Sequence, residues 1–434
     1  MRLPPPTARS THSTGKKQLR TLKKRSAIVL NSFVGNRYHV ENNQPRPESF
    51  REDYITANNK SYYSATSGII YPENVALNDS EKARLYSNLA SGAESGWDYS
   101  TRWLGRPNDA ARDVYFPLRS LNVREMIPVD LNSILYQNEV VIANYLNQTG
   151  NSTEAAKWAD LATQRSDAMY ALMWNSTLWS YFGYNLTSNS QYIYVPADDD
   201  TTAAEKATAP EGYQVLFDVA QLYPFWTGAA PDQLKNNPLA VKQAYSRVAS
   251  MLDRKAGGIP ATNLRTGQQW DQPNVWPPLM HVLMDGLLNT PATFGEDDPA
   301  YQDVQDLALR LGQRYLDSTF CTWYATGGST SATPRLQGLN PDAKGTMFEK
   351  YADNATNVAG GGGEYSVVEG FGWTNGVLLW AADTFGDRLT RPDCGNVTAA
   401  NVDPGKRSVR RAVEIDARDS PWVKKFGRAA KKGV

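Results

Sequence analysis

Residues 131–172 read LNSILYQNEVVIANYLNQTGNSTEAAKWADLATQRSDAMYAL and contain two helical patterns separated by a polar turn. From Leu131 to Leu146, apolar residues recur at the spacing that places them on one face of an α-helix. The turn at residues 147–151 ends this pattern, and Asn151 with Glu154 resembles a capping box that starts a second helix. The stretch predicts two consecutive helices and an all-α fold class.

Similar patterns extend to both sides of this stretch. Further helical patterns occupy residues 81–90, 214–222, 239–252, 275–288, 301–316 and 376–385. Polar or proline-containing turns separate them, and no segment shows the sustained alternation that predicts strands. Paired helices over this length suit a helical toroid, in which inner helices line a pocket and loops at one rim carry the chemistry.

The two ends of the chain differ from the middle in composition. Residues 1–26 contain eight Lys or Arg and no acidic residue, which is typical of a disordered basic arm. No signal peptide is visible, because the apolar stretch at residues 27–30 is too short. We therefore divide the chain into a basic arm (1–29), a helical toroid (30–396) and a charged C-terminal tail (397–434), and interpret the arm as an atypical or misassigned start.

The overall composition excludes several classes of function. Lys plus Arg and Asp plus Glu are both 45, so the chain lacks the positive field that nucleic-acid binding needs, and no apolar run is long enough to span a membrane. The histidines are His12, His39 and His281, which with Cys321 and Cys394 cannot form a zinc cluster. The sequence leaves open whether the two cysteines pair. Carboxylates remain the abundant catalytic groups.

Glycosylation sequons indicate a cellular compartment. Eight asparagines open an N-x-[ST] motif without an intervening proline. They are Asn59, Asn78, Asn147, Asn151, Asn175, Asn185, Asn354 and Asn396. We expect a glycoprotein of the secretory pathway, extracellular or vacuolar, with chance sequons as the alternative.

Two short blocks in the first quarter of the chain carry candidate site residues. Residues 46–54 read RPESFREDY, and their alternating charges suit bidentate hydrogen bonds to sugar hydroxyls. On spacing alone, a solvated charged loop is the favoured alternative. Residues 94–103 read ESGWDYSTRW and place Asp98 between Trp97 and Tyr99. Rings on both sides would desolvate this carboxyl, as a general acid requires.

Two later blocks add aromatic rings, carboxylates and glycines. Residues 268–278 read QQWDQPNVWPP, and Trp270, Asp271 and Trp276 are predicted to form a sugar-stacking wall with hydrogen-bonding edges. Core packing is the alternative for each ring. Further along, Glu349 and Glu364 flank four consecutive glycines at residues 360–363, which would allow the backbone to approach a ligand closely.

In order, spacing and composition these blocks resemble those of trehalases. Residues 269–278 read QWDQPNVWPP and fit the family pattern Q-W-D-x-P-x-x-W-x-P. The other blocks are similar to sugar-site segments of the family. The resemblance covers residues 30–396. It implies an (α/α)6 toroid that hydrolyses α,α-trehalose to two glucose molecules with inversion, without a metal or an organic cofactor.

The resemblance also assigns roles to individual residues. Asp98 is similar to the catalytic acid, and Glu349 to the base that activates water. Further positions that resemble substrate-binding residues of the family are Arg46, Pro47, Glu48, Gly96 and Glu364. An inverting glycosidase needs one protonated and one ionised carboxyl, so the paired acids agree with the implied chemistry.

The sequence also departs from the family pattern. The P-G-G-R-F block, its downstream W-D and the R-S-Q-P-P block are absent, so Arg46 is the pocket arginine that remains. We expect a toroid that is incomplete at its N-terminal end, with impaired activity. Two other interpretations stay open, a non-catalytic sugar-binding relative and a structural helical-toroid protein.

Overall fold

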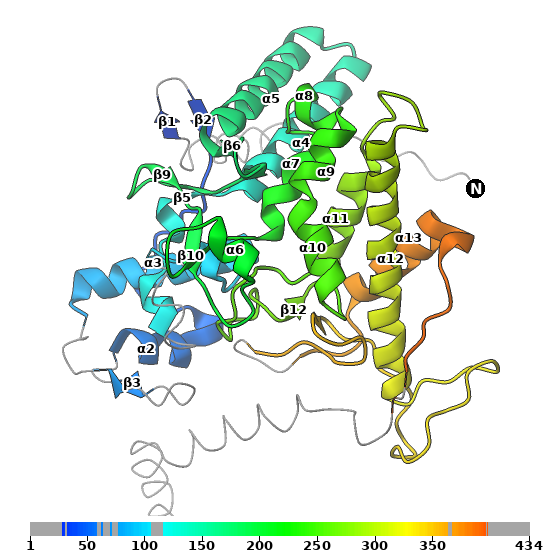
Figure 1. Cartoon of the computed structure of the whole chain (residues 1–434). Helices are drawn as coiled ribbons and strands as arrows, with labels where there is room; N and C mark the ends of the chain where they lie inside the picture. The colour runs from blue at the N-terminus through cyan, green and yellow to red at the C-terminus, as the bar shows by residue number, and fades with distance from the viewer. Residues whose placement is uncertain are drawn as a thin grey trace, which may run out of the picture.

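Helices dominate the structure, a computed structural model that describes residues 28–30, 33–58, 62–63, 70–71, 77–105, 116–362, 367–395 and 397 (Figure 1). The long helices are α3 (Asp79–Ser95), α4 (Val129–Gln148), α5 (Ser152–Met173), α11 (Pro277–Leu288), α12 (Pro299–Ala325) and α13 (Gly372–Phe385). The shorter ones are α2 (Phe50–Asn58), α6 (Ala203–Ala207), α7 (Tyr223–Thr227), α8 (Asp232–Lys235), α9 (Pro238–Ala244) and α10 (Ser246–Arg254). The predicted predominance of helices is confirmed.

The strands are two or three residues long and pair antiparallel within the described segments. Their bounds are β1 (Ile28–Leu30), β2 (Phe33–Gly35), β3 (Tyr62–Tyr63), β4 (Ile70–Tyr71), β5 (Met126–Ile127), β6 (Trp174–Asn175), β7 (Ser180–Tyr181), β8 (Tyr184–Asn185), β9 (Ser190–Gln191), β10 (Tyr194–Pro196), β11 (Tyr213–Val215), β12 (Asn274–Val275) and β13 (Tyr351–Ala352). One pair positions the site, because β12 and β13 join through Val275 opposite Tyr351.

The helices form two layers. In one layer α4, α7, α11 and α13 contact one another in succession. In the other, α5 lies against α4, and α12 lies against α11, α13 and α9. Figure 1 shows α12 beside α9 and α10, with α11 behind them. Among the residues that the structure describes, no helix combines the length and apolar composition that crossing a bilayer requires.

Helix α11 is the most buried of the long helices. Pro277 and Pro278 occupy its first positions, where a missing backbone N–H costs nothing. Most of its apolar side chains are buried, and Leu283 and Met284 are both 0% exposed. A single stripe, which includes His281 and Asp285, is only half-buried. Contacts with α7, α12 and α13 bury the rest of the helix, so α11 forms the centre of the two-layer arrangement.

The predicted helix pair at residues 131–172 is confirmed, and α4 turns a polar face toward α5. Asn151 caps α5 by accepting a hydrogen bond from the Glu154 backbone N–H at 3.3 Å. The polar face of α4 is buried, where Glu139 forms a bidentate ion pair with Arg165 of α5 at 2.9 and 2.7 Å. Residues of the predicted apolar stripe are instead 36% (Ile134), 43% (Val141) and 64% (Tyr145) exposed.

Two predicted helices were wrong in part. Residues 214–222 form the end of β11 and a 3-10 turn, and the helix α7 begins only at Tyr223. Pairing of Val215 with Tyr194 of β10 fixes the extended conformation there. The predicted helix at residues 239–252 is interrupted at Tyr245, which separates α9 from α10 and is 0% exposed. The backbone of Tyr245, with a φ of −89° and a ψ of 5°, departs from the helical conformation at this point.

A disulfide joins Cys321 in the last turns of α12 to Cys394, with a Cα–Cα distance of 5.3 Å. This answers the question of cysteine pairing that the sequence left open. The bond ties the segment after α13 back to α12. Of the predicted arm and tail, residues 28–29 belong to β1 and Val397 is described, while the remainder lies outside the described residues.

Candidate active site

Asp98 lies in the loop directly after α3. Gly96 ends this helix in the left-handed conformation with a φ of 75°, which a glycine adopts without strain. Trp97 and Tyr99 on either side of Asp98 are 4% and 1% exposed, and the Tyr99 hydroxyl donates to the Leu89 oxygen at 2.9 Å. The carboxyl-bearing loop is therefore anchored in the core on both sides of Asp98.

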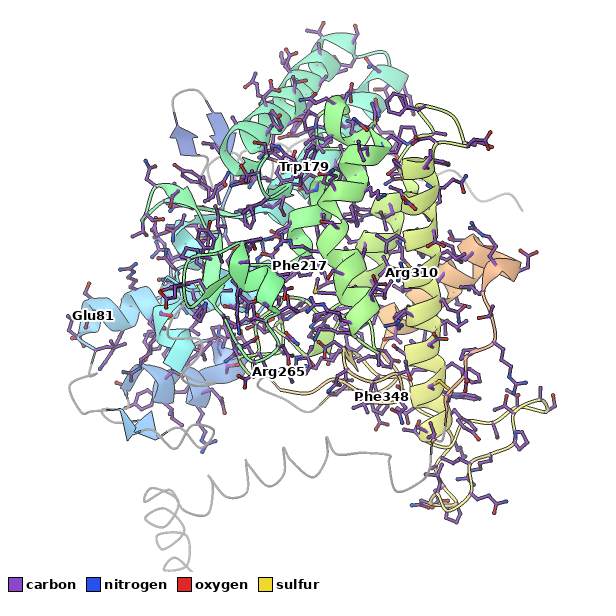
Figure 2. All side chains as sticks on the ribbon, viewed as in Figure 1. Glu81, Trp179, Phe217, Arg265, Arg310 and Phe348 are labelled. Carbon is purple, nitrogen blue, oxygen red and sulfur yellow. A yellow bond between two sulfur atoms is a disulfide. The ribbon has the colours of Figure 1, made fainter. Side chains whose placement is uncertain are left out.

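Glu349 lies on the segment that leads into β13 and is 3% exposed. Its backbone N–H donates to the Val368 oxygen at 2.9 Å, and its backbone oxygen accepts from Trp373 Nε1 at 2.8 Å. Figure 2 shows Phe348, the preceding residue, and Arg265 at the same end of the helices. The segment that leads into Glu349 and the loop of Arg265 therefore lie at one end of the helices.

The segments of Asp98 and Glu349 meet around Lys350, which is 0% exposed. Its Nζ donates to Gln269 Oε1 at 3.4 Å, and Gln269 Nε2 donates to the backbone oxygen of Asp98 at 2.5 Å. Burial lowers the pKa of Lys350 to about 8, while the negative charges of Glu349 and Asp98 act in the opposite direction. Both carboxylates are thus close enough to one ammonium group to act on it electrostatically.

The predicted aromatic wall is a stack of buried rings. Trp270 stacks on Trp276 with centroids 3.9 Å apart and on Trp97 at 5.1 Å. The second face of Trp276 is near the Lys350 ammonium, 4.8 Å from the ring centroid. With exposures of 8% for Trp270 and 1% for Trp276, the core-packing alternative describes how these rings lie. Their positions support the loops of the site from beneath.

Asp271 was expected at the edge of this wall, and the structure places it underneath the loops. It is 0% exposed. Its carboxylate accepts hydrogen bonds from the hydroxyls of Ser100, Thr262 and Thr266 and from the backbone N–H of Thr101. Burial raises the pKa of Asp271 to about 6 against these hydrogen bonds, each of which lowers it. The group links the Asp98 loop to the loop of residues 262–272.

The charged block at residues 46–54 lies beside the Asp98 loop. Arg46 is 4% exposed and forms a bidentate pair with Asp53, through Nε at 2.9 Å and Nη2 at 2.8 Å. Its guanidinium lies 5.3 Å from the centroid of the Tyr99 ring. Pro47 and Glu48, which open the 3-10 turn before α2, are exposed. Arg46 is therefore part of a buried cluster, and the solvated-loop alternative does not describe it.

The glycine-rich stretch has a close-approach function, but toward protein. A Cβ on Gly360 would lie 2.6 Å from Asn274 Oδ1 and 2.8 Å from Lys350 Cγ. One on Gly362, whose φ is 79°, would lie 2.6 Å from the Gly267 oxygen. These contacts explain the glycines without a ligand, which corrects the expectation for these two positions. Gly363 and the predicted binding residue Glu364 lie outside the described residues.

The sequence interpretation missed a buried ion pair beside Asp98. Arg102 binds Asp130 at the start of α4 through both Nη atoms, at 2.9 and 2.8 Å. Its guanidinium lies 4.5 Å from the Trp97 ring centroid and 4.3 Å from that of Trp103. Burial disfavours this charge, but Asp130 and Asp218 raise the pKa of Arg102. Arg102 belongs to the block at residues 94–103, but Asp130 lies 28 residues further along the chain, and nothing but spatial contact reveals that they pair.

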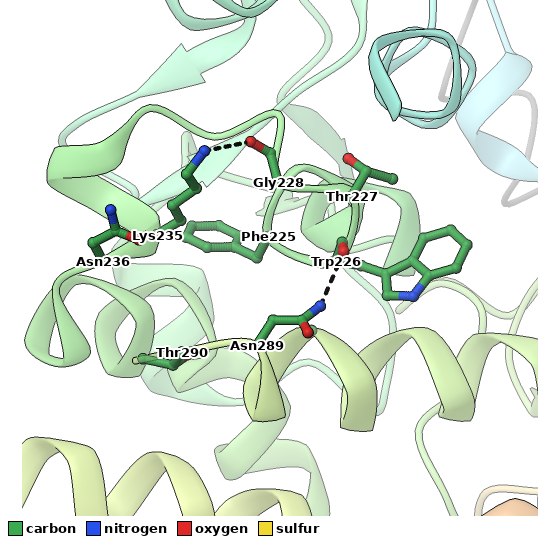
Figure 3. A pocket seen from close by; sticks show the side chains of 9 residues that line it. Phe225, Trp226, Thr227, Gly228, Lys235, Asn236, Asn289 and Thr290 are labelled. Carbon is green, nitrogen blue, oxygen red and sulfur yellow. Dashed lines mark hydrogen bonds between the residues drawn. The ribbon is translucent and has the colours of Figure 1, made fainter. Parts of the chain in front are cut away.

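A cavity of about 340 Å³ lies elsewhere in the molecule, between α7 and the end of α11 (Figure 3). Lys235 Nζ donates to the Gly228 oxygen at 2.8 Å on one side, and Asn289 Nδ2 donates to the Trp226 oxygen at 3.1 Å on the other. None of the predicted site residues lines it. We therefore locate the candidate active site at the loops that carry Asp98 and Glu349, because their carboxyl groups can act as acid and base.

Two carboxyl groups held by loops at one end of a helical fold fit the class of glycoside hydrolases. Residues 16–386 match the family model described as Trehalase, and the chain belongs to the trehalase family. The predicted fold class and family are thereby confirmed.

Individual relatives agree with this assignment. Trehalase from Oryctolagus cuniculus is 31% identical over 364 residues, which cover 83% of this chain and 49% of the relative. Periplasmic trehalase from Salmonella schwarzengrund is 31% identical over 373 residues, 86% of this chain and 50% of the relative. The solved structure of neutral trehalase Nth1 from Saccharomyces cerevisiae has a TM-score of 0.53 at 17% identity, covering 83% of this chain and 54% of that chain, and is similar in fold. The chain spans about half the length of the curated relatives it matches.

Proposed function

We propose that this protein hydrolyses α,α-trehalose to two glucose molecules with inversion of configuration. The observation that carries the proposal is that Gln269 joins the two carboxyl-bearing segments, which are far apart in the chain. It donates to the Asp98 backbone oxygen at 2.5 Å and accepts from Lys350, the neighbour of Glu349, at 3.4 Å. Family membership and the curated trehalases support the substrate. The reaction needs water and two carboxyl groups, and we propose no metal or organic cofactor.

Asp98 acts as the general acid and Glu349 as the general base. The protonated Asp98 carboxyl gives its proton to the glycosidic oxygen as the bond to the anomeric carbon breaks. The ionised Glu349 takes a proton from a water molecule, whose oxygen bonds to the same carbon from the opposite face. Each turnover consumes one water, and a proton then passes from Glu349 to Asp98 through solvent. Room for that water requires the two carboxyls to lie about 6.5–9.5 Å apart.

The remaining predicted residues divide into two groups by their exposure. Pro47, Glu48 and Gly96 are exposed, and we propose that they contact the sugar directly. Arg46 is buried at 4% exposure and paired with Asp53, so it does not belong to this group by exposure. We assign it to the sugar-binding residues from the family resemblance and from its position beside the Asp98 loop. We assign Glu364 to the same group from its place in the sequence alone.

The buried members of the predicted set have a supporting role in this proposal. Asp271, Trp270 and Trp276 hold the Asp98 loop against the loop of residues 262–272. A buried carboxylate that already accepts from hydroxyl and amide donors has little capacity left for substrate hydroxyls. Asp271 therefore acts on the reaction through the loop it fixes.

We propose that further helices would cover the helical layers and that their absence limits activity. Apolar side chains are exposed at both ends of the first layer, Tyr145 on α4 at 64% and Leu379 on α13 at 72%. Exposed apolar patches favour association with other molecules and loosen the geometry of a site they border. We therefore expect residues 1–434 alone to release glucose slowly from trehalose, and we keep sugar binding without turnover as the alternative.

The disulfide and the sequons support residence in the secretory pathway. A disulfide forms and persists in an oxidising compartment, and Cys321 is paired with Cys394. Asn147 and Asn354 are exposed and open to modification, whereas Asn185 is 6% exposed and accepts a hydrogen bond from the Thr187 backbone N–H. Glycosidase treatment of the secreted protein, followed by peptide mass spectrometry, should find glycans at exposed sequons and none at Asn185.

Glucose release from trehalose tests the catalytic proposal. The unmodified protein is compared with Asp98→Asn and Glu349→Gln, which keep size and hydrogen bonding but remove the proton donor or the base. Each variant should lose about 10²- to 10⁴-fold in kcat and still bind trehalose. Asp387→Asn, at an exposed position, is the matched control and should retain full activity. NMR of the first product formed reports the stereochemistry, and β-glucose is expected from one half of the disaccharide.

Three outcomes separate the possibilities. Near-normal turnover in either variant would mean that the wrong carboxylate is assigned. Trehalose binding without glucose release in the unmodified protein would favour the non-catalytic relative. Failure to bind any disaccharide would favour a structural protein.

A further inference from the structure

Three consecutive residues, 269–271, form hydrogen bonds with the segment that carries Asp98. Gln269 Nε2 donates to the Asp98 oxygen at 2.5 Å, and the Trp270 N–H donates to the Tyr99 oxygen at 3.2 Å. Asp271 then accepts from the next two residues along the chain. This run of contacts joins segments about 170 residues apart and fixes the position of the Asp98 backbone relative to residues 269–271.

Gln269 differs from its two neighbours because it also faces the segment of Glu349. Its Oε1 accepts from Lys350 Nζ at 3.4 Å, so the two ends of one amide contact the two carboxyl-bearing segments. Lys350 in turn donates to the Gly362 oxygen at 3.4 Å and lies over the Trp276 ring. Gln269 is 2% exposed and Lys350 0%, which leaves both side chains little freedom to move.

We propose that Gln269 and Lys350 are positioning residues that hold the segment bearing Asp98 in register with the segment bearing Glu349. Gln269 does so through the two ends of its amide, and Lys350 through its ammonium group. The inference rests on the proposed function and adds two residues to it that neither the predicted site nor the family resemblance assigned.

The chemistry of the two side chains explains why these residue types are present. A primary amide has a donor end and an acceptor end on one rigid plane, so glutamine satisfies both contacts at once. Glutamate would keep the acceptor toward Lys350 but lose the donor toward the Asp98 oxygen. The Lys350 charge lies among groups that favour it, because Glu349 on its own segment and Asp98 on the facing loop both act on it.

A change in the distance between the two carboxyls affects the transition state more than the bound substrate. Misplacement of a reacting group by about 1 Å can cost on the order of 10²-fold in rate. Removing the bridge should therefore lower kcat with much less effect on KM. Lys350 is charged below a pH of about 8 and neutral above it, so the bridge should also weaken as the pH rises through that value.

The kinetic test compares Gln269→Met, Gln269→Glu and Lys350→Met with the unmodified full chain. Each variant should lower kcat on trehalose by about 10²-fold and change KM by less than about threefold. Gln269→Glu provides a variant of unchanged size in case Gln269→Met fails to fold, and thermal melting checks folding in each. Gln243→Met and Lys206→Met, both at exposed positions, are the matched controls and should leave kcat unchanged.

Two features of the kinetics would not follow from a merely structural role. The double variant Gln269→Met with Lys350→Met should lose little more than either single variant, because residues that act through one bridge are not additive. The general acid Asp98 also produces an alkaline limb in the kcat/KM profile, so the test is whether the step near pH 8 that belongs to Lys350 disappears in Lys350→Met. Additive losses, or an unchanged kcat in Lys350→Met, would overturn the inference.

An NMR titration tests the geometry independently of turnover. In protein labelled at lysine Cε, the signal that disappears in Lys350→Met should titrate near pH 8 in the unmodified chain. Its midpoint should fall further in Asp98→Asn and in Glu349→Gln, because each removes a negative charge that favours the ammonium. If trehalose is not hydrolysed but this signal behaves as described, the proposed function fails while the bridge stands. A signal that ignores both substitutions would refute the bridge.

Discussion

Replacing Asp271 by asparagine should change how the stability of the protein depends on pH. The carboxyl group of Asp271 is 0% exposed, and burial raises its pKa from the ordinary value of 3.8 to about 6. Asparagine has nearly the same shape and cannot ionise. The substitution therefore removes the titration while keeping most of the space and some of the hydrogen bonds of the native group.

The sign and size of the effect follow from the two pKa values. Below pH 3.8 the group is protonated in both the folded and the unfolded chain, and between 3.8 and about 6 only the folded chain holds the proton. The free energy of unfolding therefore decreases as the pH rises through this window, and it levels off above about pH 6. The rise in the pKa of Asp271 from 3.8 to about 6 corresponds to a total loss of about 3 kcal/mol of unfolding free energy. The asparagine variant should lack this loss.

Urea unfolding at a series of pH values from 4 to 7 measures the effect, with the difference between the two proteins isolating Asp271 from other titrating groups. Between pH 4 and pH 7, the unfolding free energy of Asp271→Asn should rise relative to that of the unmodified protein by about 2 to 3 kcal/mol. Asp387→Asn, at an exposed position, should give a curve parallel to the unmodified protein. A parallel curve for Asp271→Asn would refute the argument from burial.

Three further predictions concern stability and association. Cys321→Ser should lower the free energy of unfolding by about 4 kcal/mol, as expected for a closed loop of 73 residues, and reduction of the unmodified protein should reproduce the loss in a denaturation curve. Leu283→Ala, at a 0% exposed position in α11, should cost about 2–5 kcal/mol, whereas Leu239→Ala, 54% exposed, should cost less than about 0.5. Tyr145→Lys on α4 should reduce self-association measured by light scattering and leave thermal melting nearly unchanged, and a large drop in melting temperature would show that Tyr145 is covered.

Local sequence signals predicted the long helices well where a cap or a break is encoded by the chain itself. Asn151 marks the start of α5 as predicted, and Pro277 marks the start of α11 within two residues of the predicted range. The break at Tyr245 could not be predicted, since no proline or glycine marks it in the sequence. Which face of α4 is buried could not be predicted from the local sequence either. Its polar face is inside because Glu139 meets Arg165, which lies on the next helix.

The predicted site shows the same division. Short blocks around Asp98 and Glu349 could be recognised because each contains several distinctive residues in a row. The bridge through Gln269 could not be derived from composition or spacing, because its two partners lie 171 and 81 residues away. Burial of Trp276 could not be derived either, because periodicity does not distinguish a ring that stacks on a sugar from one that stacks on another indole.

The disulfide between Cys321 and Cys394 closes a covalent ring that contains Glu349, Lys350 and α13. A single backbone cut anywhere inside this ring, for example by a protease acting on the exposed residues 330–332, would leave the two pieces joined. Such a nicked protein would migrate as one band without reductant and as two bands with it. The segment that carries the proposed base would stay attached to α12, and the chain can therefore tolerate proteolytic damage at this point without losing it.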